Sequence, residues 1–230
     1  MLTLEDLRIE QGSFALSAEM TIATGRRVAV IGPSGAGKST LLGAVSGFVP
    51  PASGKITLNN VDITGAAPGD RPVSMLFQDN NLFPHLTLMQ NVGLGLRPAL
   101  RLTGDEQARI KSALARVGLE GMEMRRPGAL SGGQQSRAAL ARILVQNRPL
   151  LLLDEPFAAL GPALRREMLD LVRDLATETG ATLLMVTHAP EDVLRIADEV
   201  IFVEGGRAHA PEPTAVLMDN PPPALRAYLG

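Results

Sequence analysis

The sequence predicts an α/β fold in which helices cover both faces of a mostly parallel sheet. Short apolar runs of strand type alternate with stretches of helical spacing through the second half of the chain, which is typical of parallel strands joined by helices. Near residue 32, a glycine-rich turn leads from one apolar run into a helix. Hydrophobic residues make up 45% of the 230 residues, enough for a sizeable core in one large domain or in a core domain with a smaller inserted lobe.

The N-terminal part is predicted to form strands. Apolar and polar residues alternate over Leu2–Ile9 and Phe14–Ile22, as in a half-buried antiparallel sheet. Val28–Ile31 is apolar throughout and rich in β-branched residues, so it should be a buried strand. A helix is expected over Lys38–Phe48, and another strand over Lys55–Val61, after the turn signal ProProAlaSerGly.

The middle of the chain changes to helical spacing from Asn91 to about Arg126. Ile110, Leu114 and Val117, for example, share one helical face. The remaining elements alternate between helix and strand, and in chain order they are Ser131–Gln146, Leu150–Leu153, Pro162–Glu178, Thr182–Val186, Pro190–Ala197 and Glu199–Val203.

These elements predict a single domain over residues 1–230. A parallel core and an N-terminal antiparallel β lobe are expected over about 1–90 and 148–210. The helical stretch of about 91–147 interrupts the alternation, so we interpret it as an inserted helical lobe. Residues 211–230 form a short tail rich in proline.

Composition excludes several kinds of chemistry. The absence of cysteine excludes disulfides, cysteine metal sites and a cysteine nucleophile. The formal charge of -2 disfavours nucleic acid as a partner, because phosphate binding usually brings a basic excess. The acidic N-terminus does not resemble a signal peptide, and the apolar runs are shorter than the ~18–20 residues of a membrane span. We therefore expect a soluble protein whose membrane role, if any, comes through a partner.

A phosphate-binding loop is the clearest motif. The pattern G-x-x-x-x-G-K-[ST], preceded by a strand and followed by a helix, is matched by Gly32, Pro33, Ser34, Gly35, Ala36, Gly37, Lys38 and Ser39. Such a loop turns backbone N–H groups toward phosphate oxygens at the positive end of a helix. Lys38 should reach the β- and γ-phosphates of ATP and Ser39 should bind Mg²⁺, with Thr40 next to them. The alternative is an ordinary glycine-rich turn.

Hydrolysis requires further groups, and Leu150–Leu153 leads directly to them. Asp154 stands at the end of this apolar strand, where open α/β sheets bind ligands, and can hold Mg²⁺ through its water shell. Glu155 can polarise the attacking water as a general base. The alternative is a strand that ends in two solvated acids.

A second candidate anion site precedes the strand that ends in Asp154. Ser131 can cap a helix whose first residues are glycines, which leaves N–H groups facing outward. The segment resembles the signature motif of ATP-binding cassette (ABC) ATPases, and it consists of Leu130, Ser131, Gly132, Gly133 and Gln134. The resemblance implies a RecA-like P-loop NTPase core and a homodimer in which this segment acts on the ATP of the opposite subunit. A simple helix cap is the alternative.

The same resemblance assigns two more residues. Gln78, in MetLeuPheGlnAsp, resembles the glutamine that touches Mg²⁺, so the implied metal site comprises Ser39, Gln78 and Asp154. His188, in MetValThrHis, resembles the histidine that contacts the γ-phosphate, so the implied catalytic set is Glu155, His188 and Lys38. Either Gln78 or His188 could instead be an incidental polar residue after a strand.

The chain departs from the family pattern in two places. Gly161 stands where the common form has an aspartate, which leaves a contact across the dimer without its carboxylate. The aromatic residue that often stacks on adenine would fall near Gln11. The nearest aromatic residue is Phe14, which we expect to pack in a strand.

The resemblance extends over about residues 2–208 and is most specific to bacterial importers of thiamine or thiamine pyrophosphate, whose pattern Gly161 also fits. It implies a membrane permease, gripped near 80–86, a periplasmic thiamine-binding protein, and a peripheral position on the cytoplasmic face of the inner membrane. Importers of iron, sulfate or polyamines, efflux or lipoprotein-release ATPases and DNA-repair ATPases are the alternatives. The last usually carry a long coiled coil, and no sustained heptads occur here.

Overall fold

The computed structural model describes residues 1–79 and 81–229. Residue 80, where the segment expected to contact a permease begins, and residue 230 lie outside the described residues. The strands are β1 (Leu2–Gln11), β2 (Phe14–Ile22), β3 (Arg27–Ile31), β4 (Ser53–Leu58), β5 (Val61–Asp62), β6 (Val73–Leu76), β7 (Leu150–Asp154), β8 (Thr182–Val186), β9 (Glu199–Glu204), β10 (Arg207–Ala208) and β11 (Glu212–Pro213). The α-helices are α1 (Lys38–Ser46), α2 (Leu88–Gly93), α3 (Gly104–Arg116), α4 (Gly132–Gln146), α5 (Pro162–Thr179), α6 (Pro190–Ile196), α7 (Thr214–Asp219) and α8 (Pro223–Leu229).

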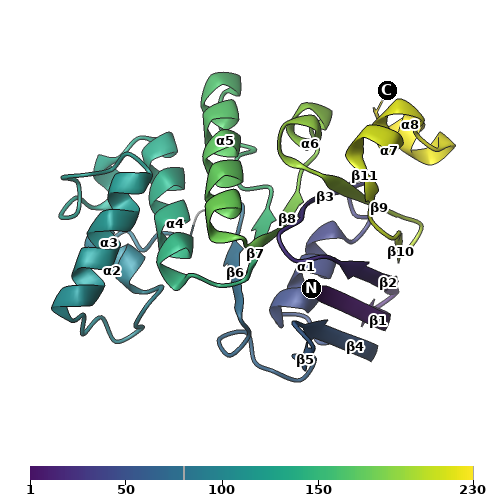
Figure 1. Cartoon of the computed structure of the whole chain (residues 1–230), viewed down its shortest axis with the longest axis horizontal. Coiled ribbons are helices and arrows are strands. Elements are labelled where there is room, and N and C mark those ends of the chain that lie inside the picture. The colour runs from purple at the N-terminus through teal and green to yellow at the C-terminus, as the bar shows by residue number, and fades with distance from the viewer. Residues whose placement is uncertain (80, 230) are drawn as a thin grey trace.

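One continuous sheet links two kinds of strand pairing. Strands β9, β3, β8, β7 and β6 are parallel neighbours, in that order, and β1, β2, β4 and β5 form an antiparallel group. The short strand β10 joins them, because it pairs in parallel with β2 and antiparallel with β9. Figure 1 shows α2 and α3 at one end of the molecule and the antiparallel strands at the other.

The apolar strand β7 explains how the sheet is covered on both faces. Leu150 and Leu152 pack in a cluster with α1 and the antiparallel strands, whereas Leu151 and Leu153 pack with α4 and α5. Side chains of a strand alternate between faces, so a strand between two helical layers must be apolar at every position. All four leucines are accordingly buried.

The helices α2, α3 and α4 begin at well-formed caps. Thr87, Thr103 and Ser131 each accept a hydrogen bond from the backbone N–H three residues on, and each forms a complete capping box. Their buried residues belong to a cluster that continues into α5 and β7. The helical part therefore shares one core with the sheet, and its description as a separate lobe stays a prediction.

Three local features differ from the sequence-based expectation. The strand expected over Lys55–Val61 ends at Leu58, because Asn59 and Asn60 adopt positive φ values of 50° and 64° and turn the chain into β5. Strand β6 was implied before Gln78 but given no range, because its sequence ValSerMetLeu contains a polar residue and only one β-branched residue. The proline-rich tail contains two helices, α7 and α8, whose Leu217 and Leu225 are buried.

No helix within the described ranges combines the length and the hydropathy that a membrane span requires.

Candidate nucleotide site

The phosphate-binding loop lies between the centre of the sheet and α1. Strand β3, which has β8 and β9 as neighbours, ends at Ile31, and α1 begins at Lys38. Gly32 has φ 149°, and a Cβ there would lie 2.1 Å from the carbonyl oxygen of Val203. Gly37 has φ 105°, and its Cβ would lie 2.5 Å from Cζ of Phe14. Both positions therefore require glycine for conformation and for space.

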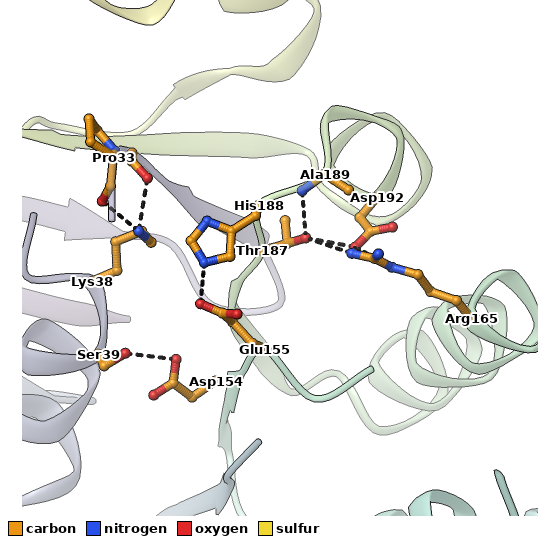
Figure 2. A network of polar contacts seen from close by, with 11 residues as sticks. Pro33, Lys38, Ser39, Asp154, Glu155, Arg165, Thr187, His188, Ala189 and Asp192 are labelled. Carbon is orange, nitrogen blue, oxygen red and sulfur yellow. Dashed lines mark hydrogen bonds and ion pairs between the residues drawn. The ribbon is translucent and has the colours of Figure 1, made fainter. Parts of the chain in front are cut away.

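Lys38 holds the loop from the inside. Its side chain is buried, and Nζ donates hydrogen bonds of 2.8 Å to the carbonyl oxygens of both Gly32 and Pro33 (Figure 2). Burial lowers the pKa of Lys38, and the negative charges of Glu155 and Asp154 oppose that shift. The loop thus surrounds an ammonium group whose stem is fixed by α1.

Asp154 and Ser39 meet at the edge of the sheet. Asp154 is the last residue of β7, and Ser39 Oγ donates a hydrogen bond of 3.0 Å to its Oδ1. Burial raises the pKa of Asp154, and the hydrogen bond from Ser39 opposes that rise. Two oxygen ligands of the kind that hard cations prefer therefore stand side by side.

Glu155 and His188 form another part of the wall around the space next to Lys38 and Ser39. His188 follows β8, and its Nε2 contacts Oε1 of Glu155 (Figure 2). Glu155 has φ 47°, which is unusual for a residue with a side chain, and its backbone N–H donates to the carbonyl of Val186 at 3.2 Å. Such backbone strain gathers at functional sites, because surrounding structure must hold it in place.

These groups surround an open pocket of about 310 Å³. Its lining residues are Gln11, Phe14, Ser34, Gly35, Gly37, Lys38, Ser39, Thr40, Glu155 and His188. Gly32, Pro33 and Asp154 support the pocket through their contacts with Lys38 and Ser39, and Ala36 packs on the side of α1 and the antiparallel strands.

The family resemblance put the expected adenine position near Gln11, which does line this pocket, but the sequence analysis did not predict that Phe14 lines it as well. Phe14 begins β2, as expected, but its ring also rests against Gly37. The only sequence signal was that Phe14 is the aromatic residue nearest the expected adenine position. Its place beside the loop depends on how the β1–β2 hairpin folds over α1.

Two predicted elements do not reach the pocket within this chain. Gln78 is exposed and lies two residues beyond the end of β6, and it is not among the described residues that line the pocket. The segment Leu130–Gln134 is also absent from that lining. It opens α4 instead, where Ser131 accepts from the N–H of Gln134 at 3.3 Å.

The beginning of α4 packs closely against α5. A Cβ at Gly133 would lie 2.4 Å from Cδ2 of Leu164, which is in the first turn of α5. Gly133 therefore lets the two helices approach one another.

Comparison with known proteins agrees with this arrangement. Residues 16–158 match the model of a protein family described as "ABC transporter". The chain belongs to the ABC transporter family. Among ABC proteins, two relatives named "Thiamine import ATP-binding protein ThiQ" match it over the full length of both chains. The relative from Cereibacter sphaeroides is 62% identical and the one from Ruegeria sp. is 60% identical.

Solved ABC structures confirm the predicted fold class, an α/β P-loop NTPase. The cassette MJ0796, described as a dimer in a post-hydrolysis state bound to ADP and Pi, aligns with TM-score 0.80 and 29% identity, over 93% of this chain and 99% of that one. The ADP conformation of the cassette MJ1267 aligns with TM-score 0.90 over 100% and 98% of the two chains. At 24% identity it supports the fold alone.

Proposed function

We propose that this chain is the ATP-hydrolysing subunit of a bacterial ABC importer that takes up thiamine. The observation that carries the proposal is the convergence of Lys38, the Ser39–Asp154 pair and the Glu155–His188 pair on one pocket. The full-length relatives named for thiamine import support the solute. Selection of the solute itself belongs to partner proteins.

The loop binds the phosphates of ATP. Backbone N–H groups at the start of α1 and the Lys38 ammonium meet the β- and γ-phosphate oxygens, and the glycines bring the backbone close enough. Phe14 and Gln11 lie at the side of the same pocket, where the rest of the nucleotide extends.

Ser39 and Asp154 would hold Mg²⁺, with Gln78 as the further ligand that the family resemblance implies. Two oxygens 3.0 Å apart suit a hard cation. Among the described residues no group of three or more His, Cys, Asp or Glu could hold a metal. This agrees with a cation that takes most of its ligands from phosphate and water. When bound there, the cation would supply positive charge to the phosphates.

Glu155 orients and deprotonates the attacking water, and His188 contacts the γ-phosphate. Their side chains touch at the pocket wall, so both face the position of the terminal phosphate. Catalysis of phosphoryl transfer consists mainly of positioning and charge stabilisation, which Lys38 supplies from the opposite side.

Two copies of the chain act together. Leu130–Gln134 does not line the pocket of its own chain but presents the N-terminus of α4, a 15-residue helix. Its N–H groups act on the ATP of the second copy, in keeping with the dimeric state described for MJ0796. Gly161 leaves this dimer without the aspartate contact common in the family.

The membrane function comes through partners. An integral membrane permease binds the helical lobe and the nearby segment around residues 81–86, and a periplasmic thiamine-binding protein delivers the solute to that permease. The chain then lies on the cytoplasmic face of the inner membrane as a peripheral subunit, and no nucleic acid is involved.

A Glu155→Gln variant tests the proposed chemistry. It keeps the shape of the side chain but loses the base, so hydrolysis should fall by at least ~100-fold while ATP binding remains. Phosphate release and nucleotide binding measure the two properties, with the exposed Glu120→Gln as a matched control. A wild-type rate in Glu155→Gln would show that the base is assigned wrongly.

The solute is tested separately. In vesicles that contain the permease and its binding protein, thiamine should stimulate ATP hydrolysis, and sulfate, iron or spermidine should not. Stimulation by one of these others alone would replace thiamine and leave the ATPase assignment intact.

A further inference from the structure

A buried polar network lies directly behind His188. It consists of Arg165 in the first turn of α5, Thr187 after β8, and Asp192 in the first turn of α6, and we call it the Thr187 network (Figure 2). Thr187 and Asp192 are only 3% and 6% exposed. Polar groups buried this deeply are stable only when they are hydrogen-bonded, so these bonds are structurally significant.

The hydroxyl of Thr187 uses its full hydrogen-bonding capacity. It donates to Oδ2 of Asp192 at 2.6 Å, and accepts from the backbone N–H of Ala189 at 3.2 Å and from Nη2 of Arg165 at 3.3 Å. Arg165 also donates to Oδ2 of Asp192, through Nε at 3.0 Å and through Nη2. A threonine hydroxyl has one donor and two acceptor positions, so its orientation is fully determined.

This network fixes the residues on both sides of His188. The N–H of Thr187 donates to the carbonyl of Val30 in β3 at 3.3 Å, while its side chain holds the N–H of Ala189. His188 therefore extends from a backbone anchored before and after it. Its own side chain is 44% exposed and points away from the network, toward Glu155 (Figure 2).

A second ion pair joins the same two helices without touching this backbone. Arg195 of α6 donates to Asp170 of α5 through Nε at 2.9 Å and through Nη2, at the protein surface. It links α5 to α6 as the Arg165–Asp192 pair does, but through two side chains that are not members of the Thr187 network. It therefore provides a control for simple helix docking.

We propose that Arg165, Thr187 and Asp192 are positioning residues that hold His188 in the orientation needed at Glu155 and the terminal phosphate. The proposal rests on the ATPase function proposed above. None of the three is among the described residues that line the nucleotide pocket. Loss of the network should therefore lower kcat and leave the KM for ATP nearly unchanged, because small misplacements of a reacting group cost rate rather than binding.

The test uses the ATPase subunit assembled with its permease. Thr187→Val keeps the shape but removes the hydroxyl, and kcat should fall about 10- to 100-fold with KM within about threefold. Thr187→Ser should recover most of the lost rate. Arg165→Lys keeps a positive charge near Asp192. A lysine ammonium lacks the planar guanidinium that donates to Asp192 and Thr187 together, so this variant should also lower kcat.

A double-mutant cycle distinguishes positioning from a general structural effect. If Thr187 acts through His188, then Thr187→Val should cause no further loss in a His188→Ala background. Asp170→Asn should leave kcat unchanged. The proposal is overturned if Thr187→Val and Arg165→Lys both keep the wild-type kcat. It is also overturned if Asp170→Asn lowers kcat equally, or if the Thr187→Val loss persists without His188.

These results remain separable from the proposed function. Failure of the ATPase assignment would appear as an unchanged rate in Glu155→Gln, whatever the Thr187 variants do. A Thr187→Val protein with a normal KM for ATP is folded at its nucleotide site, so its kcat then decides the proposal.

Discussion

At the scale of single residues, the position of Lys38 has a direct consequence for nucleotide affinity. Its ammonium donates hydrogen bonds to two loop carbonyls. Among the described residues that line the pocket, no other lysine and no arginine is present. Lys38→Met should weaken ATP binding about 10- to 100-fold, since a hydrogen bond to a charged group contributes ~1.5–3 kcal/mol.

Calorimetric titration with ATP measures that loss. Lys55→Met is the matched control, because Lys55 is an exposed lysine whose Nζ lies 3.9 Å from Asp62, outside the pocket. An unchanged dissociation constant for Lys38→Met would contradict the role of its ammonium.

The sequence alone places candidate residues together where chemistry and sequence spacing coincide. The loop from Gly32 to Ser39 is contiguous, and Asp154 and Glu155 directly follow an obvious strand, so the sequence alone placed them together. Phe14 reaches the pocket, and Asp192 reaches the Thr187 network next to His188, only through tertiary packing. The one available signal for Asp192 was an acidic residue on the same face of α6 as buried apolar residues, and such a signal is common in proteins.

At the scale of secondary-structure elements, one ion pair fixes the start of two central strands. Arg27, the first residue of β3, donates to Asp198, just before β9, through Nη2 at 2.6 Å and Nε at 3.1 Å. The backbone N–H of Arg27 also donates to the same carboxylate at 3.1 Å. Hydrogen bonding from the Arg27 side chain lowers the pKa of Asp198, against the effect of partial burial.

This shift makes the contribution of Asp198 dependent on pH. A carboxyl group with a depressed folded-state pKa stabilises the protein above its unfolded pKa of ~3.9, and that stabilisation is lost as the pH falls through the folded-state pKa. Asp198→Asn should thus lower the free energy of unfolding by about 1–2 kcal/mol at pH 7, and by progressively less as the pH falls below ~4.

Urea unfolding of Asp198→Asn and wild type at several pH values measures this dependence. Asp219→Asn, at an exposed position in α7, serves as the control. A difference from wild type that stays constant down to pH 3 would exclude the ion pair as its source.

Prediction of the elements depended on length and pattern. Long alternating strands such as β1 and β2 were predicted, because one of their faces is buried and the other is not. The four residues of β6 carry too little pattern, and their strand conformation comes from pairing with β7. The turn at Asn59–Asn60 was signalled by two adjacent asparagines, which tolerate positive φ, but the apolar residues on either side obscured it.

At the scale of the whole molecule, the proposed dimer predicts an ATP-dependent change of mass. In the Glu155→Gln variant, ATP should convert monomers of the chain into dimers. The bound ATP is not hydrolysed, so it remains between the two copies. Adding Ser131→Arg should abolish them, since a long charged side chain would stand at the N-terminus of α4 where the partner's phosphate is expected.

Light scattering during size-exclusion chromatography measures this change. Thr103→Arg is a matched control, because Thr103 forms the same capping box at the exposed start of α3. It should lose the same helix cap and still allow dimers. Dimers that persist in Ser131→Arg would place the contact between copies elsewhere.

The close packing of Gly133 on Leu164 has a wider consequence. Leu164 is followed by Arg165, so one turn of α5 touches both the signature segment and the Thr187 network. In the proposed dimer, the signature segment Leu130–Gln134 would act on the partner's ATP and His188 would act on the ATP of its own chain. This single helical turn would then connect the two nucleotide sites of the dimer through the interior of one chain. If binding of one nucleotide changes the affinity for the second, then binding of the second must change the affinity for the first by the same factor.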